Sequence, residues 1–337
     1  MLKSSNGADS AKRVRMGVIG ASSFVAQAAV IPAILESRYA DLVAVASTSN
    51  AKKLDNHHGV QLYRNYEDLM NADDVDAVYI PTPNSLHAEA VRFAISNGKH
   101  VLCEKPLAMS ENQATELVTF AASNQRILME AYMTHYHPRE KELMKAILAK
   151  DAGRVRNIYA GFTGSLDRKE DFRWKPEMGG GSLRDVGVYL ISPILQAAGG
   201  LPYSVVGNAN YHTTGVDESF TGLLNFKDGM TATIFSSFVS GDGQYLRVTF
   251  EKGWISLRNA FTPTLKDNLL EVSDQTGKMQ SVNTKPANCY LEMVNHFCDL
   301  VSGRSAPSRP LSMSVMVQRV IDHLLVSAQN KQIEILE

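Results

Sequence analysis

A lysine stands directly after an apolar, strand-like run in the segment HVLCEKP at positions 100–106. In an open parallel sheet, ligands bind just outside the carboxyl ends of the strands. Lys105 occupies such an end, so its ammonium group is placed to hydrogen-bond and polarise a hydroxyl or carbonyl oxygen. Lys105 is therefore the first candidate catalytic residue.

A second segment that can do chemistry follows the glycines at 179–181. Glycines allow close backbone approach and unusual dihedral angles, and we expect a helix to begin near Ser182. Asp185 and Tyr189 are four residues apart and share one face of that helix. A phenol and a carboxylate together can orient a hydroxyl and exchange a proton with it, and a cation such as Lys105 would favour the phenolate. The alternative is that Tyr189 packs in the core and Asp185 caps a turn.

Two further polar residues are candidates for substrate binding. Arg173 precedes the glycines and is able to bind a polar ligand, although a surface role explains it equally well. His135 and His137 face one side of an extended segment, and we expect His135 to reach a substrate cleft. No cysteine or carboxylate joins these histidines, or the pair at 57–58, at ligand spacing, so we predict no metal site.

These side chains need a scaffold, and the first part of the chain alternates strand-like with helix-like patterns. Strands separated by helices predict a doubly wound parallel sheet, which is an α/β fold. Pro32 is expected to kink or break the first helix. The predicted strands are 14–19, 42–46, 76–80, 101–103 and 127–129, and the predicted helices are 24–37, 86–96 and 111–123.

The first predicted strand ends in the turn GASSFVA at positions 20–26. Backbone amides and a helix N-terminus in such a turn hold a dinucleotide pyrophosphate. Gly20 fills the first position of this fingerprint and is followed by Ser22, Ser23 and Phe24, but Ser22 and Val25 replace the second and third glycines. The motif by itself leaves a plain strand–turn–helix as an alternative.

The end of the second strand bears on the type of cofactor. NAD-selective sites usually place an Asp or Glu there to accept from the ribose hydroxyls, whereas this chain has Ser47 and Thr48, followed by Lys52 and Lys53. Small hydroxyls and nearby cations suit a 2′-phosphate. NADP(H) is therefore favoured, with NAD(H) possible, and the alternative is that the lysines form a solvated helix face.

The loop after the strand at 76–80 also lies at the carboxyl edge of the predicted sheet. Two prolines stiffen it, and a polar side chain can cap the next helix. A capped turn with His87 on a helix face is the alternative to a binding loop. We expect the nicotinamide half of the cofactor to be held by Pro81, Thr82, Asn84 and His87, with Glu104 and Lys105 beside it.

After about residue 150 the pattern changes to longer strand-like runs joined by turn signals, which predict a mostly antiparallel sheet. We divide the chain into a loose tail at 1–12, a dinucleotide-binding Rossmann domain at 13–134 and a C-terminal α+β domain with an open sheet at 135–337. The predicted strands are 155–162, 203–211, 220–226, 230–239 and 254–257, and the closing helices are about 288–302 and 311–329.

Composition argues against several classes of partner. The 337 residues are 44% hydrophobic and 20% charged with a net charge of -1, so nucleic acid and anionic membranes are not favoured. No apolar run approaches the roughly 18 residues of a membrane span, and the polar, basic start is unlike a secretory signal. Three cysteines, at 103, 289 and 298, fit a reducing compartment. We expect a cytoplasmic protein.

Taken together, these residues resemble the Gfo/Idh/MocA family over nearly the whole chain. The resemblance rests on the Gly20 turn, the TPN loop at 82–84, the EKP motif at 104–106, and the triple glycine that leads to Asp185 and Tyr189. It implies a Rossmann domain, a second domain with an open sheet, and a substrate between them. It also implies that the outer face of that sheet forms a homodimer or homotetramer.

The resemblance further implies that Lys105 belongs to the catalytic centre, and that Ser47 and Lys52 occupy positions used by NADP-binding members. Many members carry histidine where this chain has Tyr189. Tyrosine there is similar to the branch of glucose–fructose oxidoreductase, dihydrodiol dehydrogenase and sugar 3-ketoreductase.

The sequence thus predicts an NAD(P)-dependent oxidoreductase acting on a secondary hydroxyl or ketone of a sugar, sugar derivative, polyol or diol. Tyr189 would donate the proton in reduction, Lys105 would lower its pKa and hydrogen-bond the reacting oxygen, and Asp185 would hold a neighbouring hydroxyl. Two alternatives stay open: a cofactor-sensing regulator on the same fold, and a redox-neutral, NAD-dependent glycosidase.

Overall fold

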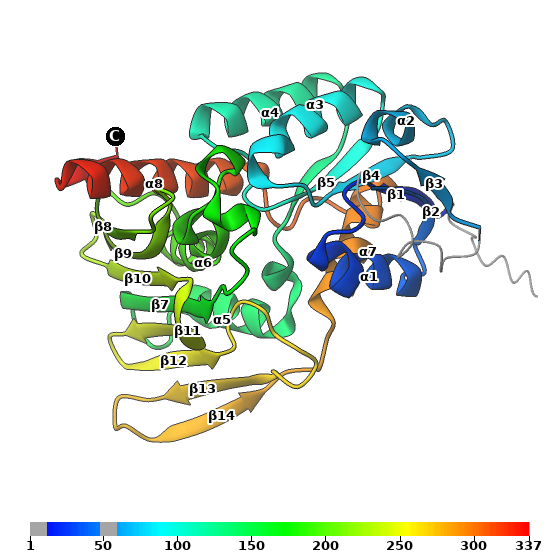
Figure 1. Ribbon diagram of the computed structural model, residues 1–337. Helices are drawn as coiled ribbons and strands as arrows, with labels where there is room; N and C mark the ends of the chain where they lie inside the picture. Colours follow the sequence, from blue (N-terminus) through cyan, green and yellow to red (C-terminus); the bar gives the residue numbers. More distant parts are fainter. Residues whose placement is uncertain (1–11, 48–58, 337) are drawn as a thin grey trace, which may run out of the picture.

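A computed structural model describes residues 12–47 and 59–336, which form two sheets flanked by helices (Figure 1). The first sheet is parallel, as predicted, and has six strands in the order β3-β2-β1-β4-β5-β6 where five were expected. The strand order reverses between β1 and β4, and in open α/β sheets ligands bind at such a reversal. The strands are β1 (Val14–Val18), β2 (Ala40–Ala46), β3 (Gln61–Tyr63), β4 (Ala77–Ile80), β5 (His100–Glu104) and β6 (Leu128–Ala131).

Helices cover both faces of this parallel sheet. One face carries α2 (Tyr66–Asn71), α3 (His87–Ser96) and α4 (Glu111–Ser123), and the other carries α1 (Ile31–Glu36) together with α7 (Cys289–Val301) from the end of the chain (Figure 1). Alternate strand residues feed the two cores: Val78 packs toward the α2–α4 side, whereas Tyr79 packs in the core shared with the second sheet. The parallel sheet is therefore buried on both sides, as its apolar strands require.

The predicted helices agree with the structure except near Pro32. Helix α4 has the predicted bounds because the Ser110 side chain caps it by accepting from the Gln113 amide. The segment expected as one helix at 24–37 contains a π-helical stretch, η1 (Ala26–Val30), before α1. Pro32 lies in the first turn of α1, where a missing amide hydrogen is tolerated. The short elements β3 and α2 were not predicted.

The second sheet has nine strands in the order β14-β13-β12-β11-β7-β10-β9-β8-β15. Its neighbours are antiparallel except for the parallel pair β7 and β10, so the prediction of a mostly antiparallel sheet is confirmed. The polar hairpin of β13 and β14 was not predicted. The strands are β7 (Val155–Ser165), β8 (Ser204–Tyr211), β9 (Asp217–Asn225), β10 (Thr231–Ser237), β11 (Val239–Phe250), β12 (Gly253–Arg258), β13 (Leu269–Ser273), β14 (Met279–Asn283) and β15 (Glu334–Ile335).

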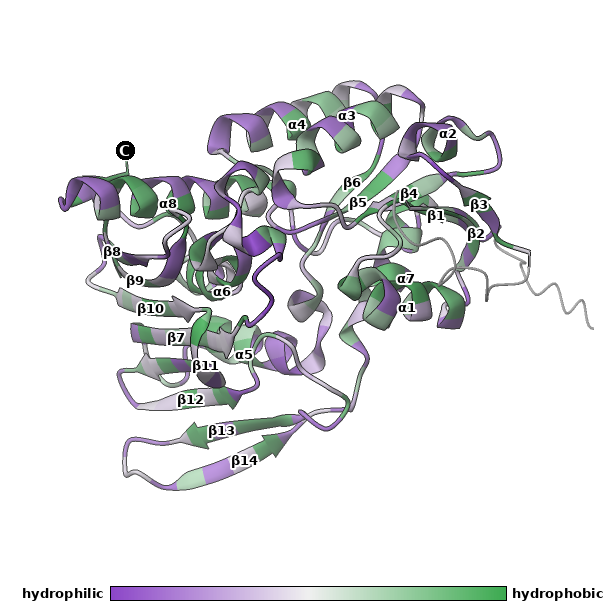
Figure 2. Cartoon of the chain, viewed as in Figure 1, coloured by the Kyte–Doolittle hydropathy of each residue, from purple (hydrophilic) through white to green (hydrophobic). Residues whose placement is uncertain are grey.

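Three helices, α5 (Pro138–Ala149), α6 (Val188–Ala198) and α8 (Leu311–Asn330), cover one face of the second sheet. Figure 2 shows α6 hydrophobic along most of its length, and its residues from Val188 to Leu195 are all buried. Helix α8 also packs on α4 and β6 of the first sheet. Helix α8 thus contacts both sheets, and α6 packs between α8 and β7.

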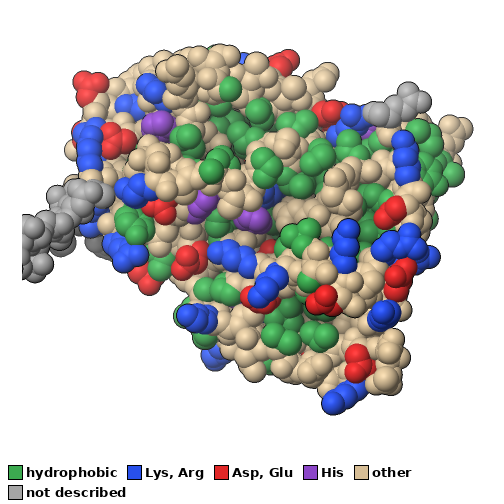
Figure 3. Space-filling view, turned by 180° about the vertical axis from the view of Figure 1, so that it is seen from behind, with side chains coloured by type: hydrophobic (Ala, Val, Ile, Leu, Met, Phe, Trp, Pro, Cys, Tyr) green, Lys and Arg blue, Asp and Glu red, His purple; other side chains and the backbone are tan. Residues whose placement is uncertain are grey.

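The surface of the molecule carries mixed charge. Figure 3 shows basic and acidic side chains interspersed on the rear face, in keeping with the net charge of -1. In the part of the chain that the structure describes, no helix combines the length and the apolar character that a membrane crossing needs.

Candidate active site

A cavity of about 620 Å³ lies at the carboxyl edge of the parallel sheet and is closed on its other side by residues of the second sheet and α6. It lies where the strand order reverses, as the fold predicts. The residues predicted for the site that line it are Ser23, Phe24, Pro81, Thr82, Asn84, Glu104, Lys105, Arg173, Asp185 and Tyr189.

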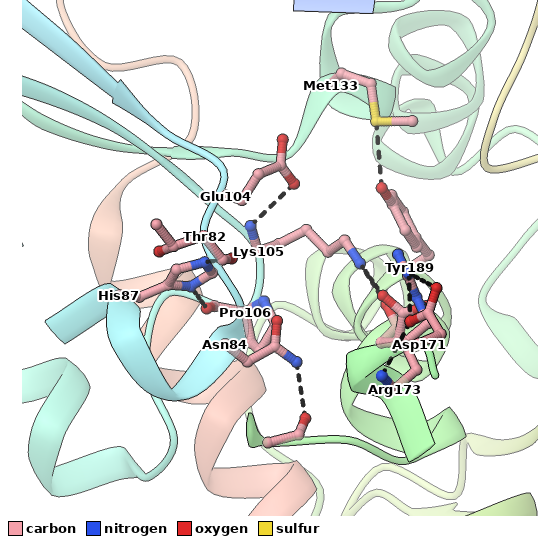
Figure 4. Close-up of polar contacts among 12 residues, drawn as sticks. Thr82, Asn84, His87, Glu104, Lys105, Pro106, Met133, Asp171, Arg173 and Tyr189 are labelled. Carbon is pink, nitrogen blue, oxygen red and sulfur yellow. Dashed lines mark hydrogen bonds and ion pairs between the residues drawn. The ribbon is translucent and has the colours of Figure 1, made fainter. Parts of the chain in front are cut away.

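Lys105, labelled in Figure 4, points toward Arg173 and Tyr189 and forms a buried ion pair with Asp185. Lys105 enters from the end of β5, and Asp185 comes from the π-helical turn η7 (Leu183–Gly187) that leads into α6. Lys105 Nζ donates to Asp185 Oδ1 at 2.8 Å and to the Asp185 backbone oxygen at 2.7 Å. An ammonium group has three protons, so one remains that Lys105 can donate to a ligand.

The phenol of Tyr189 lies beside this ammonium group. Lys105 Nζ is 5.0 Å from the centroid of the Tyr189 ring, within cation–π range. Tyr189 Oη donates to Met133 Sδ at 3.5 Å, and a thioether is a weak acceptor that a ligand oxygen can displace. Lys105 and Tyr189 therefore lie next to each other in the wall of the cavity.

The pKa of Tyr189 is shifted upward, opposite to the lowering expected from Lys105. Burial raises the pKa of Tyr189 well above its usual value, and the nearby groups Tyr290, Glu104 and Asp185 act in the same direction. The phenol is therefore neutral near pH 7 and carries a proton that it can give.

Arg173 is engaged by two carboxylates. Its Nε donates to Asp185 Oδ2 at 2.6 Å, and its Nη1 donates to Asp171 Oδ1 at 3.1 Å. Burial acts to raise the pKa of Asp185, but the charges of Arg173 and Lys105 outweigh it and hold that pKa well below the usual range. Asp185, expected to hold a substrate hydroxyl, binds Lys105 and Arg173 in this structure and also lines the cavity. Asp171 was not among the predicted residues.

Of the residues predicted to hold the pyrophosphate, Ser23 and Phe24 line the cavity, and Gly20 and Ser22 precede them in the same turn. Gly20 has φ +55°, a left-handed conformation that favours glycine, and its carbonyl accepts from the Ser23 amide at 2.9 Å. Ser47, at the end of β2, donates through Oγ to Ser22 Oγ at 3.0 Å. The predicted residues Thr48 and Lys52 lie outside the described residues.

Thr82 and Asn84 follow β4 and face the same cavity. Thr82 Oγ1 is buried and has no hydrogen-bond partner within the described chain, and leaving such a group unpaired costs about 1–3 kcal/mol. A ligand with an amide or hydroxyl group would satisfy it. Asn84 Nδ2 donates to the Gly179 backbone oxygen at 2.8 Å, so this loop is tied directly to the triple glycine.

His87 does not line the cavity. Its ring is fully buried, and its two nitrogens each lie 2.8 Å from a backbone oxygen, that of Thr82 and that of Pro106. Burial lowers the pKa of His87. The imidazole therefore joins the Thr82 loop to the Lys105 loop and acts as a structural link between two binding segments.

His135 does not reach this cavity either. It lines a separate one of about 570 Å³ along α5, together with Glu140. Burial lowers the pKa of His135 to about 4, so the ring is neutral at pH 7. In the described ranges, 12–47 and 59–336, no three His, Cys, Asp or Glu side chains gather as metal ligands would.

Other lining residues were not predicted, among them Phe162 of β7, Arg168 of the following loop and Tyr290 of α7. No local motif marks them, because they reach the cavity only when the second sheet and α7 close over the first.

Two family models match the sequence. An oxidoreductase family with an NAD-binding Rossmann fold matches residues 14–132, and the GFO/IDH/MocA C-terminal domain matches residues 141–256. The chain is 32% identical over 319 residues to D-xylose 1-dehydrogenase (NADP(+)) 2 of Haloferax volcanii, covering 93% of this chain and 97% of that protein. It is 32% identical over 260 residues to dTDP-3,4-didehydro-2,6-dideoxy-α-D-glucose 3-reductase of Actinomadura kijaniata. That match covers 75% of this chain and 77% of the reductase.

A solved structure has the same fold. KijD10, a 3-ketoreductase from Actinomadura kijaniata in complex with NADP and TDP-benzene, superposes with a TM-score of 0.86 at 26% identity, covering 94% of this chain and 98% of that one. The length of these matches, together with the Lys105, Asp185 and Tyr189 geometry, leads to one conclusion: the chain belongs to the Gfo/Idh/MocA family of oxidoreductases.

Proposed function

We propose that this protein is an NADP(H)-dependent oxidoreductase that transfers a hydride between the nicotinamide and a secondary hydroxyl or ketone of a sugar, sugar derivative, polyol or diol. The observation that carries the proposal is the meeting of Lys105, Asp185 and Tyr189 in one cavity at the carboxyl edge of the Rossmann sheet. The named relatives act on D-xylose and on a dTDP-linked keto sugar, which supports the substrate class.

We place the cofactor in this cavity and along the turn that follows β1. We assign the pyrophosphate to the turn of Gly20, Ser22, Ser23 and Phe24, and the 2′-phosphate to Ser47 with Thr48 and Lys52. The unpaired, buried hydroxyl of Thr82 supports a nicotinamide carboxamide near Pro81, Asn84 and Glu104. When bound, the cofactor supplies or accepts the hydride.

Side chains of the protein supply the proton that the substrate oxygen takes up on reduction. In the reductive direction the carbonyl oxygen of the substrate takes a proton, and the neutral phenol of Tyr189 is its donor. The uncommitted proton of Lys105 hydrogen-bonds the same oxygen and stabilises the negative charge that develops there. Asp185 orients that ammonium group through its two contacts.

The second sheet is proposed to serve both substrate binding and assembly. Residues 135–337 would form the substrate domain, and the uncovered face of the sheet would join copies of the chain into a homodimer or homotetramer. Large exposed side chains on the uncovered face support this: Tyr159, Leu223 and Leu269. Three buried, unpaired cysteines support a reducing, cytoplasmic setting.

The test follows the absorbance of reduced nicotinamide with the purified protein, NADP⁺ or NAD⁺, and a panel of aldoses, inositols, keto sugars and diols. We expect turnover with at least one sugar or polyol, and a higher kcat/KM with NADP⁺ than with NAD⁺. Tight cofactor binding without turnover of any compound would instead support a regulator. Cleavage of glycosides without net cofactor reduction would support the redox-neutral glycosidase.

A further inference from the structure

A second buried ion pair lies behind the segment that carries Lys105. Arg309 Nη1 donates to Glu130 Oε2 at 2.8 Å, and the two side chains are only 4% and 3% exposed. Ser314 Oγ donates to the same carboxylate oxygen at 2.7 Å and accepts from Arg309 Nη1 at 2.9 Å. None of the three lines the catalytic cavity, so they do not contact a ligand there.

One end of this pair reaches the Lys105 loop. Glu130 lies on β6 opposite Cys103 of β5, and its second oxygen, Oε1, accepts from the Leu107 amide at 2.9 Å. Leu107 is two residues after Lys105. The Glu130 carboxylate therefore anchors the backbone that presents the catalytic ammonium group.

The other end of the pair reaches the helix that carries Tyr189. Arg309 Nη2 donates to Ser192 Oγ on α6 at 3.5 Å. The Arg309 guanidinium also lies 4.9 Å from the centroid of the Tyr132 ring, and Tyr132 Oη donates to the Tyr189 backbone oxygen at 3.2 Å. Arg309 therefore contacts α6 directly and through Tyr132.

We propose that Arg309 and Glu130 are positioning residues that set the placement of Lys105 relative to Tyr189, an inference that rests on the proposed function. The pair connects the two catalytic segments from behind, through Leu107 on one side and Ser192 and Tyr132 on the other. Stability alone does not require a buried ion pair, because well-packed apolar residues often replace one without loss. Placement of the two catalytic groups does require this connection, and a misplacement of about 1 Å can lower turnover about a hundredfold.

The decisive variant replaces both charges, Arg309→Met with Glu130→Met. We expect it to fold with an unfolding midpoint near that of the wild type, and to bind NADPH with a Kd within about threefold, since neither side chain lines the cavity. Its kcat is expected to fall at least about tenfold because the reacting groups are misplaced. The primary deuterium isotope effect on kcat, measured with 4-deuterated NADPH, is expected to rise as hydride transfer becomes rate-limiting.

The matched control is the exposed pair Arg92–Glu116, whose side chains are 40% and 65% exposed and 2.6 Å apart. The double change Arg92→Met with Glu116→Met should leave kcat and the isotope effect unchanged. If the decisive variant does not fold, Arg309→Lys replaces it, since lysine keeps the charge but lacks the planar group that contacts Ser192 and Tyr132. Wild-type kcat and isotope effect in the double variant, or in Arg309→Lys when that is the variant used, would overturn the proposal.

A crystal structure of the same variant separates this inference from the proposed function. We expect the Lys105 Nζ to Tyr189 ring-centroid distance, 5.0 Å in the parent, to change in the variant. This comparison stays informative even if the wild type turns over no sugar in the panel, and an unchanged distance would count against positioning.

Discussion

Two buried ion-pair clusters lie on opposite sides of the Lys105 loop and differ in access to ligand. The catalytic-side cluster joins Lys105, Asp185 and Arg173, and it lines a cavity. The rear cluster joins Arg309 and Glu130, whose side chains are less than 5% exposed. Neither residue lines the cavity that contains Lys105. Both clusters connect the Rossmann sheet to the C-terminal half of the chain.

The difference shows that a buried ion pair can either present a charge to a ligand or hold two segments of the protein together. In the catalytic-side cluster Lys105 keeps one proton uncommitted next to open volume, so its charge is available to a ligand. In the rear cluster both Glu130 oxygens are bound by the protein itself. Access to the cavity, more than the type of pair, decides which charge does chemistry.

The largest expected effect is on turnover in the catalytic-side cluster. Lys105→Met and Tyr189→Phe should each lower kcat at least about a hundredfold, because each removes a group at the reacting oxygen. Stability should change little in Tyr189→Phe, since the lost contact is one weak bond to Met133. Steady-state kinetics with the best sugar substrate measures the effect, and near-full activity in either variant would contradict the mechanism.

The next effect concerns stability and compares the clusters directly. Glu130→Ala leaves Arg309 charged, buried and unpaired, and should lower the free energy of unfolding by roughly 3–5 kcal/mol. Asp185→Asn should lower it by less, because Arg173 keeps Asp171 as a partner and the cavity admits water. Urea unfolding of both variants tests this order, and an equal or larger loss in Asp185→Asn would show that cavity access does not distinguish the clusters.

The carboxyl group of Glu140 is buried outside both clusters and tests what burial does to a carboxyl group without an ion pair. Burial raises the pKa of Glu140 to about 7 from a usual value of 4.5, and its Oε1 has no partner among the described residues. The unfolded chain loses this proton first as pH rises, so the folded state is progressively disfavoured between about pH 4.5 and 7, by roughly 3 kcal/mol in all.

Glu140→Gln removes that titration. The variant should be as stable as the wild type near pH 4.5 and more stable by up to roughly 3 kcal/mol at pH 8. Unfolding free energies of both proteins at the two pH values check this, and a stability difference that does not vary with pH would show that Glu140 is not buried as a neutral acid.

The smallest predicted effect separates two roles for Arg173. Arg173→Lys keeps a cation but loses the fork that binds Asp171 and Asp185 together, so kcat should fall about tenfold with little change in substrate KM. Steady-state kinetics at saturating NADPH measure kcat and the substrate KM separately. A large rise in KM at constant kcat would return Arg173 to the substrate-binding role that the sequence suggested.

The parallel sheet and the motif at its edge could be predicted from sequence because their signals are local. An apolar strand followed by Glu104-Lys105-Pro106 marks a strand end, and the helix expected at 111–123 has the bounds of α4. The hairpin of β13 and β14 was missed because β14 is exposed along its whole length and shows no alternation of polar and apolar residues.

The site was only partly accessible for the same reason. The four-residue spacing of Asp185 and Tyr189, and the presence of Lys105 beside them, could be predicted, but the contacts of Asp185 with Arg173 and of Tyr189 with Met133 could not. Arg173 binds Asp185 and Asp171 rather than standing free, and His135 lies along α5 in a different cavity. The direction of the pKa shift of Tyr189 was also missed, because it depends on burial and on Tyr290 of α7.

Local sequence is sufficient to place chemical groups at strand ends and helix starts, since backbone conformation and hydrophobic periodicity are properties of neighbouring residues. The packing of distant segments then sets which of those groups share a cavity, which are neutralised by partners and which are buried away from water. The pair Arg309 and Glu130 is the clearest case, because 179 positions separate its members and no local pattern relates them. Burial and long-range contact arise only when the two sheets pack together, and they determine which charges remain available for catalysis.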